Sequence, residues 1–235
     1  MAASCRKLGL PEGSRRIFDQ GLPLVLEFIP AGQSLLGGGT TLAARWQHRD
    51  SLNIDLFTSR TTFTQAIYRQ RAQFKVRLEE LGAGRIAMLG PDGCAFYVQG
   101  GKVEVLSFPP LTHPSRSVDC TGSPSIALET SLEILAKKLH RRMIVHGRIV
   151  PRDLYDLAYA RRFEPALLDA VWSSGEVRDP EVLAAALSSF SPGWIERHEE
   201  PVANPRFPDL LDSAVQDMLD DVVSRFSLTH SPQER

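Results

Sequence analysis

Apolar and polar residues alternate in the first half of the chain in segments typical of both strands and helices. Three short β-like runs, Arg85–Leu89, Ala95–Val98 and Lys102–Phe108, are separated by the sequences GPDG and QGG. Because such sequences form tight hairpin connections, the three runs predict a β-meander. Upstream, Thr61–Leu81 is long, polar and free of helix breakers, which predicts a helix that ends at Gly82.

After the sequence VDCTGSPS at positions 118–125, the pattern becomes mostly helical. Thr130 or Ser131 is suited to cap a helix that continues to about Val145. The pattern predicts further helices at Asp153–Arg162, Pro165–Ser173, Pro180–Phe190 and Asp209–Phe226. The last of these carries acids on one side and apolar residues on the other, so we expect it to dock its apolar side on the body. A role of this helix in self-inhibition or partner binding is the alternative.

The predicted fold class is therefore α+β. An α/β N-terminal lobe with a mixed sheet and flanking helices is followed by a helical C-terminal lobe. We expect the domains at residues 1–120 and 121–228, with a disordered tail at 229–235.

Composition excludes several classes of protein. The chain has 235 residues, of which 43% are hydrophobic, so it can bury a core. Its net charge of −1 gives no global argument for nucleic-acid binding. The wide spacing of the three cysteines indicates neither a disulfide framework nor a zinc pattern. With no signal peptide and no apolar run long enough to span a bilayer, we expect a soluble cytoplasmic protein without a membrane partner.

The candidate chemistry begins at a glycine-rich turn, Gly37–Gly39, which lets the backbone approach a ligand closely. Thr40 and Thr41 are expected to start a helix whose free N–H groups could hold phosphate oxygens. A tight turn without a ligand is the alternative. His48 and Arg49, further on, could cap this helix or contact phosphate.

A strand-like sequence, NIDLF, follows thirteen residues after the glycines. Asn53 and Asp55 lie two residues apart, so on a strand they face the same side and could grip one magnesium ion. Glu104 is a charge in the middle of an apolar strand and is the candidate for a third ligand. The alternatives are that Asp55 caps the next helix and that Glu104 faces solvent on an edge strand.

Three segments, in this order, resemble the AbiEii/AbiGii-type nucleotidyltransferase toxins: GGGTTLAARWQHRDSLNIDLF, LEILAKKLHRR and PRDLYDLAYA. The motifs of that family read roughly GGTALALRxGHRxSxDIDLF and KL…R…RDxYDL. The resemblance covers about positions 34 to 160. It implies a nucleotidyltransferase-type mixed sheet of the DNA-polymerase-β kind.

The resemblance also implies residue roles. It assigns nucleotide binding to Gly38, Gly39, Thr40 and Lys138. It assigns catalysis to Asp55, Glu104, Lys138, Asp153 and Asp156. Metal binding falls to Asp55, Glu104 and, through its amide oxygen, Asn53. The simpler interpretations are that Lys138 is solvated like its neighbour Lys137, and that Asp153 only caps a helix after Pro151 and pairs with Arg152.

The function implied is Mg²⁺- or Mn²⁺-dependent transfer of NMP from an NTP to an RNA, first of all a transfer RNA. The family also implies the toxin half of a toxin–antitoxin or phage-defence pair, with a cognate antitoxin as partner. Residues 137–162 carry eight Lys or Arg and two Asp, a local charge of +6 that suits a triphosphate or an RNA backbone.

Asn53 is the departure from the family, which has Asp at this position. An amide ligates a metal without contributing a charge. The alternative function is therefore a catalytically weakened or inactive relative that acts as a nucleotide- or protein-binding module. A third hypothesis keeps the enzyme and makes a protein hydroxyl the acceptor.

Overall fold

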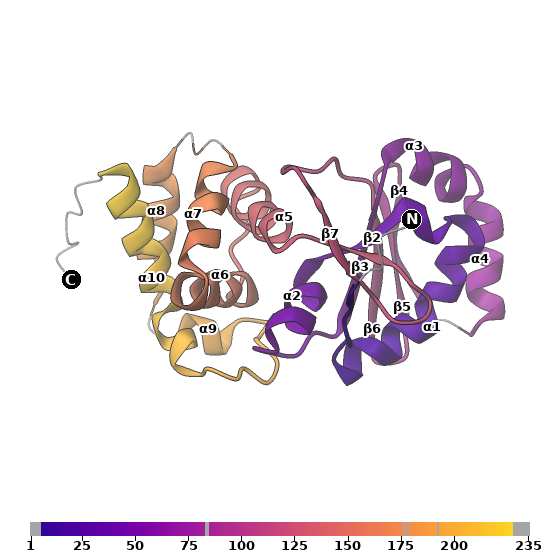
Figure 1. Cartoon of the computed structure of the whole chain (residues 1–235), viewed down its shortest axis with the longest axis horizontal. Helices are drawn as coiled ribbons and strands as arrows, with labels where there is room; N and C mark the ends of the chain where they lie inside the picture. Colours follow the sequence, from indigo (N-terminus) through magenta and orange to yellow (C-terminus); the bar gives the residue numbers. More distant parts are fainter. Residues whose placement is uncertain (1–5, 83–84, 176, 178, 192, 228–235) are drawn as a thin grey trace. The chain divides into compact units, whose positions relative to one another are not determined.

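The computed structural model (Figure 1) describes residues 6–82, 85–175, 177, 179–191 and 193–227. Cys5 and the tail predicted at 229–235 lie outside the described residues. No helix in the described part of the chain is long and apolar enough to cross a membrane.

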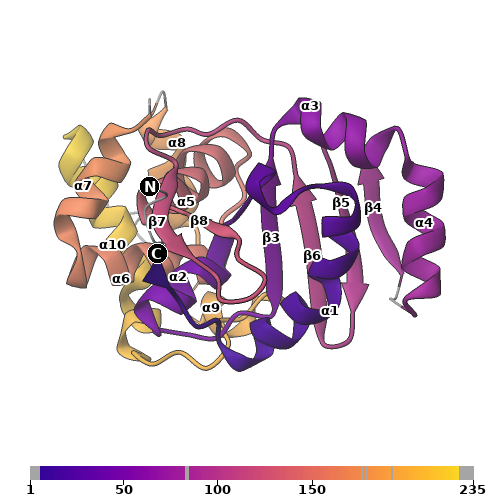
Figure 2. The ribbon, with the colours of Figure 1, turned by 45° about the vertical axis from the view of Figure 1, so that its right-hand side comes forward.

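Eight strands of the described residues form a single mixed sheet with the order β1-β7-β8-β2-β3-β6-β5-β4. Their bounds are β1 Arg6–Lys7, β2 Ser34–Leu36, β3 Asn53–Thr58, β4 Ile86–Gly90, β5 Gly93–Val98, β6 Gly101–Leu106, β7 Arg116–Cys120 and β8 Ala127–Glu129. β3 and β6 are parallel neighbours near the middle of the sheet, and Figure 2 shows them side by side. The predicted meander is confirmed, because β4, β5 and β6 pair antiparallel in chain order.

Helices and an apolar core cover one face of the sheet. On one face, α1 (Glu12–Phe28) and α4 (Arg71–Glu80) pack through apolar side chains on the central strands (Figure 1). Ile54 and Leu56 of β3 point into this core and are almost fully buried. Because strand residues alternate, the intervening side chains of β3, including Asp55, lie on the opposite face. The acidic face of β3 is therefore the face turned away from the apolar core.

The predicted helix at Thr61–Leu81 is interrupted. It consists of α3 (Arg60–Phe63), a π-helical segment η2 (Thr64–Tyr68) and α4. Gly82, with a φ of 59°, adopts the left-handed conformation that ends the last of these as expected. Cys94 on β5 is a free thiol, and burial raises its pKa to about 12.

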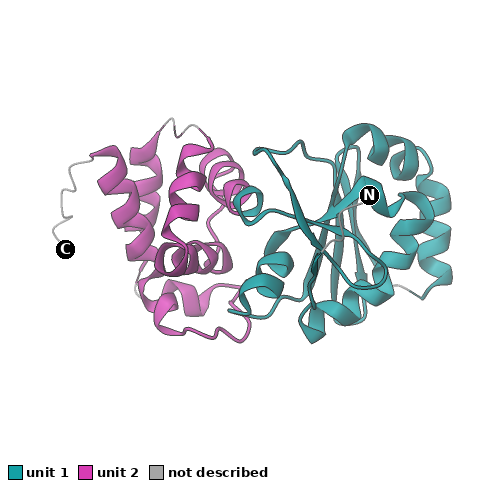
Figure 3. Ribbon diagram, viewed as in Figure 1, with its two compact units in different colours: residues 1–134 teal, residues 135–235 magenta. Residues whose placement is uncertain are grey.

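The chain divides into two compact units, residues 1–134 and 135–235 (Figure 3). The division falls within α5 (Ser131–Ala136). Residues 121–134, which we assigned to the helical lobe, contain β8, and β8 pairs with β2 and β7. This short strand escaped prediction because three residues show no recognisable alternation. Thr130 caps α5, since its Oγ1 accepts the N–H of Glu133 at 3.1 Å.

The second unit is helical, as predicted. After the π-helical η3 (Lys137–Val145) come α6 Pro151–Phe163, α7 Pro165–Ser173, α8 Pro180–Ser188, α9 Trp194–Arg197 and α10 Asp209–Phe226. α10 packs against α6 and α8. Its apolar residues, such as Met218 and Val222, are buried, while its acids remain at the surface or pair with Arg161. This confirms the expectation that α10 docks its apolar side.

Candidate active site

Two carboxylates stand next to each other in the sheet. In the parallel pairing of β3 and β6, Asp55 is the direct partner of Glu104. Both side chains lie on the face opposite the apolar core and are partly buried. β6 lies between β3 and β5, so it is no edge strand, and the alternative that placed Glu104 on an exposed edge is wrong.

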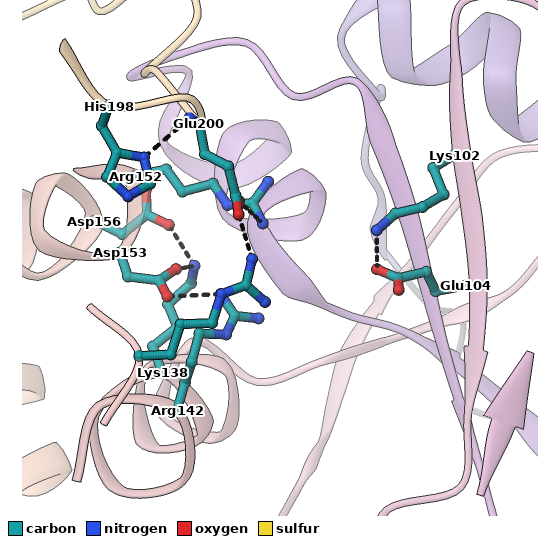
Figure 4. A network of polar contacts seen from close by, with 10 residues as sticks. Lys102, Glu104, Lys138, Arg142, Arg152, Asp153, Asp156, His198 and Glu200 are labelled. Carbon is teal, nitrogen blue, oxygen red and sulfur yellow. Dashed lines mark hydrogen bonds and ion pairs between the residues drawn. The ribbon is translucent and has the colours of Figure 1, made fainter. Parts of the chain in front are cut away.

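The pairing changes the titration of Glu104. Its pKa is raised above the ordinary value, first by burial and then by the negative charge of Asp55. The ammonium of Lys102, 3.2 Å from Glu104 Oε2, opposes this increase in pKa (Figure 4). Two adjacent carboxylates of this kind favour a bound cation or a shared proton.

The glycine turn approaches this pair directly. Gly38 begins α2 (Gly38–Trp46), two residues earlier than expected, and has a φ of 62°. A Cβ at Gly38 would overlap the carboxylate of Asp55. The preceding residue, Gly37, donates its N–H to the carbonyl of Asp55 at 2.9 Å. Glycine is therefore required here by both backbone conformation and close approach, which is more than a tight turn needs.

The two neighbouring glycines are also confined by charged side chains. A Cβ at Gly37 would overlap the carboxylate of Glu129, and a Cβ at Gly39 would overlap the guanidinium of Arg49. Glu129 ends β8 and is almost fully buried. Sequence reasoning missed Glu129, because it contributes to this turn only through the pairing of β8 with β2.

Thr40 joins the start of α2 to the strand that carries Asp55. Its Oγ1 donates a hydrogen bond to the carbonyl of Asn53 and lies 2.8 Å from Ser51 Oγ. The Thr40 side chain is fully buried. In this structure its side chain positions β3 against α2, and its backbone N–H, in the first turn of the helix, is the part suited to an anion.

The donor set of this site fits a hard divalent cation. Asp55 and Glu104 supply carboxylate oxygens, and Asn53 lies on the same face of β3. Mg²⁺ typically takes one or two protein carboxylates together with substrate phosphates. Among the described residues, no three His, Cys, Asp or Glu side chains gather to hold a metal. A cation at this position would therefore meet two carboxylates and one amide.

A second polar cluster lies in the helical unit. Lys138 on η3 contacts the carboxylates of both Asp153 and Asp156 on α6, the latter at 3.0 Å (Figure 4). Arg142 Nη1 lies 2.6 Å from Asp153 Oδ2. Both aspartates are fully buried, and the Lys138 side chain is only 5% exposed. Burial alone would raise the pKa of Asp153, but the charges of Lys138 and Arg142 outweigh it and hold the pKa below the ordinary value.

The simpler interpretations of this cluster are wrong. Lys138 is buried rather than solvated. The N-cap residue of α6 is Val150, whereas Asp153 lies in the first turn and pairs with Lys138 and Arg142. Arg152 pairs instead with Glu200, at 2.8 Å.

Glu200 forms ion pairs with two further cationic residues of the same unit. Its carboxylate contacts Arg148 as well as Arg152, and its N–H donates to His198 Nδ1 at 2.9 Å (Figure 4). These arginines keep the pKa of Glu200 low, although burial acts in the opposite direction. Both arginines lie in the basic segment 137–162 that the sequence indicates, but sequence reasoning missed Glu200, about 50 residues away.

The remaining alternatives concern caps in the first unit. Ser59, not Asp55, caps α3, because its Oγ accepts the N–H of Thr62 at 3.0 Å. Gln47, with a φ of 51°, ends α2, so neither His48 nor Arg49 is its C-cap residue.

Lys102 is a further residue of the Asp55–Glu104 site that sequence reasoning missed. The available signal was its position two residues before Glu104 on the same strand.

A comparison with known protein families places the chain in one family. The family described as "Nucleotidyl transferase AbiEii toxin, Type IV TA system" matches residues 29–225. This is a family of nucleotidyltransferases, and the match covers most of the chain. The chain therefore belongs to the AbiEii nucleotidyl transferase toxin family, which confirms the resemblance seen in the sequence.

Similar solved structures are distant in sequence. JHP933 from Helicobacter pylori is 13% identical, with a TM-score of 0.48 over 93% of this chain and 97% of that one. A putative nucleotidyltransferase from H. pylori is 12% identical, with a TM-score of 0.46 over 94% and 100% of the two chains. The antibiotic-resistance factor ANT(2'')-Ia is 15% identical, with a TM-score of 0.38 over 74% and 90%. No curated protein matches the chain.

Proposed function

We propose that this protein transfers NMP from an NTP to an RNA acceptor, with transfer RNA as the first candidate, in a reaction that depends on Mg²⁺ or Mn²⁺. The observation that carries the proposal is the direct pairing of Asp55 with Glu104 beside the Gly38 start of α2. That arrangement combines a carboxylate pair for a cation with backbone N–H groups for phosphate.

Asp55 and Glu104, with the amide oxygen of Asn53, would hold the metal ion. When bound, the ion supplies positive charge that neutralises the triphosphate and orients it. The acceptor hydroxyl oxygen forms a new bond to the α-phosphorus as the bond to the bridging oxygen of pyrophosphate breaks. Glu104 takes the proton of the hydroxyl, a role that suits a carboxylate whose pKa is raised.

The remaining predicted residues act on the nucleotide. The first N–H groups of α2, at Gly38, Gly39 and Thr40, are proposed to bind phosphate oxygens. We assign Lys138 to the triphosphate, with Asp153 and Asp156 fixing the position of its ammonium group. Support for this assignment is the burial of all three side chains, which a solvated helix face would not require.

A labelled-NTP assay tests the proposal. Purified protein is incubated with total RNA, each of the four α-labelled NTPs and either Mg²⁺ or Mn²⁺. We expect label on RNA, strong reduction of labelling in Asp55→Asn, and no reduction in the control Asp19→Asn, an exposed acid on α1. Absence of label from every acceptor, even with Asn53→Asp, would exclude the catalytic function. Label on protein instead of RNA would assign a protein hydroxyl as the acceptor.

A second candidate function is nucleotide or protein binding without turnover. Asn53 favours it, because the amide removes one negative charge from the metal site. This second function predicts that calorimetry detects NTP binding while no nucleotide is transferred. It also predicts that the cellular effect of the protein persists in Asp55→Ala. A loss of that effect in Asp55→Ala would exclude this second function.

The family suggests that a cognate antitoxin neutralises the toxin activity in the cell. Expression of this chain is expected to arrest growth, and Asn53→Asp is expected to strengthen the arrest because it restores a charged metal ligand. Growth curves with Asp55→Asn as the inactive control measure this. Equal growth of all three strains would count against the role as a toxin.

A further inference from the structure

Four side chains form a two-by-two block on the sheet face opposite the apolar core. In the parallel register, Asn53 is the partner of Lys102, and Asp55 is the partner of Glu104. We call these four residues the β3–β6 block. The acids thus stand side by side, and the amide stands beside an ammonium group.

The block has an unusual charge balance for a metal site. Its two carboxylates and one ammonium sum to a charge of −1, whereas a site with three carboxylates carries −3. The Lys102 ammonium is 3.2 Å from Glu104 Oε2, and the two side chains are 28% and 23% exposed. Lys102 therefore directs its charge at one of the two carboxylates that the proposed function assigns to the metal ion.

Position 53 decides what Lys102 can do. An Asp at this position would face Lys102 across the strands and compete with Glu104 for the ammonium. Asn53 offers no charge, so Glu104 is the acid of the block that Lys102 contacts. The amide at 53 and the lysine at 102 then act in the same direction, because each lowers the number of divalent cations that the block can hold.

We propose that Lys102 is a built-in positive charge that takes the place of a second metal ion, so that the β3–β6 block holds a single divalent cation. Polymerases and many related phosphoryl-transfer enzymes use two metal ions to stabilise the attacking and leaving oxygens. In this chain, a fixed ammonium would supply part of that charge. The inference rests on the proposed function, since it concerns the same carboxylates. It makes Lys102 a positioning residue that acts through Glu104.

Titration of the full-length protein with Mn²⁺ alone, followed by the electron paramagnetic resonance of free Mn²⁺, tests the inference without any catalytic readout. We expect one Mn²⁺ per wild-type chain, lost in Asp55→Asn. Lys102→Gln should tighten binding about tenfold, because a competing charge a few ångströms away is removed. Lys102→Arg, which keeps the charge, should bind as the wild type does.

The double variant Asn53→Asp/Lys102→Gln should bind a second Mn²⁺. Lys75→Gln on α4 serves as the matched control, because Lys75 is exposed and its replacement should leave Mn²⁺ affinity unchanged. Lys102→Met is measured in parallel, and thermal melts verify that each variant is folded.

The outcomes separate this inference from the proposed function. If Mn²⁺ binding depends on Asp55 but does not change in Lys102→Gln or Lys102→Met, the inference is overturned and the proposed function stands. Two Mn²⁺ ions per wild-type chain also overturn it and leave the proposed function intact. Absence of Asp55-dependent Mn²⁺ binding in every variant overturns both.

Discussion

Asp55 and Glu104 are direct partners across two parallel strands, with their side chains on the sheet face opposite the apolar core. Two acids in this position repel each other when both are ionised, and the raised pKa of Glu104 reflects burial first and this repulsion second. The arrangement costs stability in the absence of a cation, and under the proposed function a bound cation would offset this cost. Several consequences of this relationship, and of the buried cluster around Lys138, are measurable.

Gly38→Ala should impair both stability and nucleotide binding. The residue has a φ of 62°, and a Cβ would overlap the Asp55 carboxylate, so strand and turn must separate. We expect a loss of about 2 kcal/mol in the free energy of unfolding. Urea unfolding and NTP calorimetry measure the two effects. The control is Gly32→Ala, where a Cβ meets no atom within 4 Å, and equal behaviour of the two variants would contradict the assignment.

Glu104→Gln should stabilise the metal-free protein at neutral pH. The folded-state pKa of Glu104 is raised, so the native state binds more protons than the unfolded state between the two pKa values. The contribution of Glu104 to stability therefore falls as pH rises from about 4 through its folded pKa, and the Gln variant escapes this loss. We expect a difference of about 1 kcal/mol at pH 8 that disappears near pH 4.

The same variant should behave oppositely when Mn²⁺ is present. A ligand that binds only the native state stabilises it, and Glu104→Gln removes one of the charged ligands. Thermal melts with and without Mn²⁺ therefore compare the two variants. A Gln variant that is less stable than the wild type in the absence of metal would show that the Lys102 contact outweighs the repulsion from Asp55.

Lys138→Met should destabilise the second unit by about 3 to 5 kcal/mol, because it leaves Asp156 and Asp153 buried with less compensation. Lys137→Met, at the half-buried neighbouring position, should cost less than about 1 kcal/mol. Circular dichroism during urea unfolding measures both. Similar losses in the two variants would contradict a special role for Lys138.

Asp153→Asn should cost more stability at pH 7 than at pH 3. The folded-state pKa of Asp153 is lowered by Lys138 and Arg142 against the effect of burial. Its contribution is therefore present above the unfolded pKa of about 3.9 and is lost as pH falls through the folded value. The difference between wild type and variant should shrink progressively below pH 4 in urea titrations. A difference that is constant with pH would mean that the aspartate contributes shape rather than charge.

Local sequence patterns were sufficient for many elements of this fold. The meander of β4 to β6 follows from apolar runs separated by turn sequences, and the last helix lies at Asp209–Phe226 as its pattern predicts. The short strands β2 and β8 follow from no such pattern, because three residues cannot display a period. They exist because each pairs with neighbours that are distant in sequence.

The residue types of the candidate site are also visible in the sequence. The glycine turn, the alternation of Asn53 and Asp55, and an acid within the apolar run around Glu104 indicate phosphate and cation chemistry through local pattern alone. What they cannot show is register. A shift of one residue between β3 and β6 would turn Glu104 to the other face and away from Asp55.

The sequence by itself therefore determined the family, the two kinds of lobe and most residues of the candidate site, because these depend on local periodicity and on motif spacing. Only the tertiary structure decided which charged groups pair: Lys102 with Glu104, and Lys138 with Asp153 and Asp156. It also decided that the carboxylate of Glu129 lies against the glycine turn. These contacts depend on strand pairing and helix packing between segments far apart in the chain. Electrostatic energy varies with distance and burial, which only the folded chain defines.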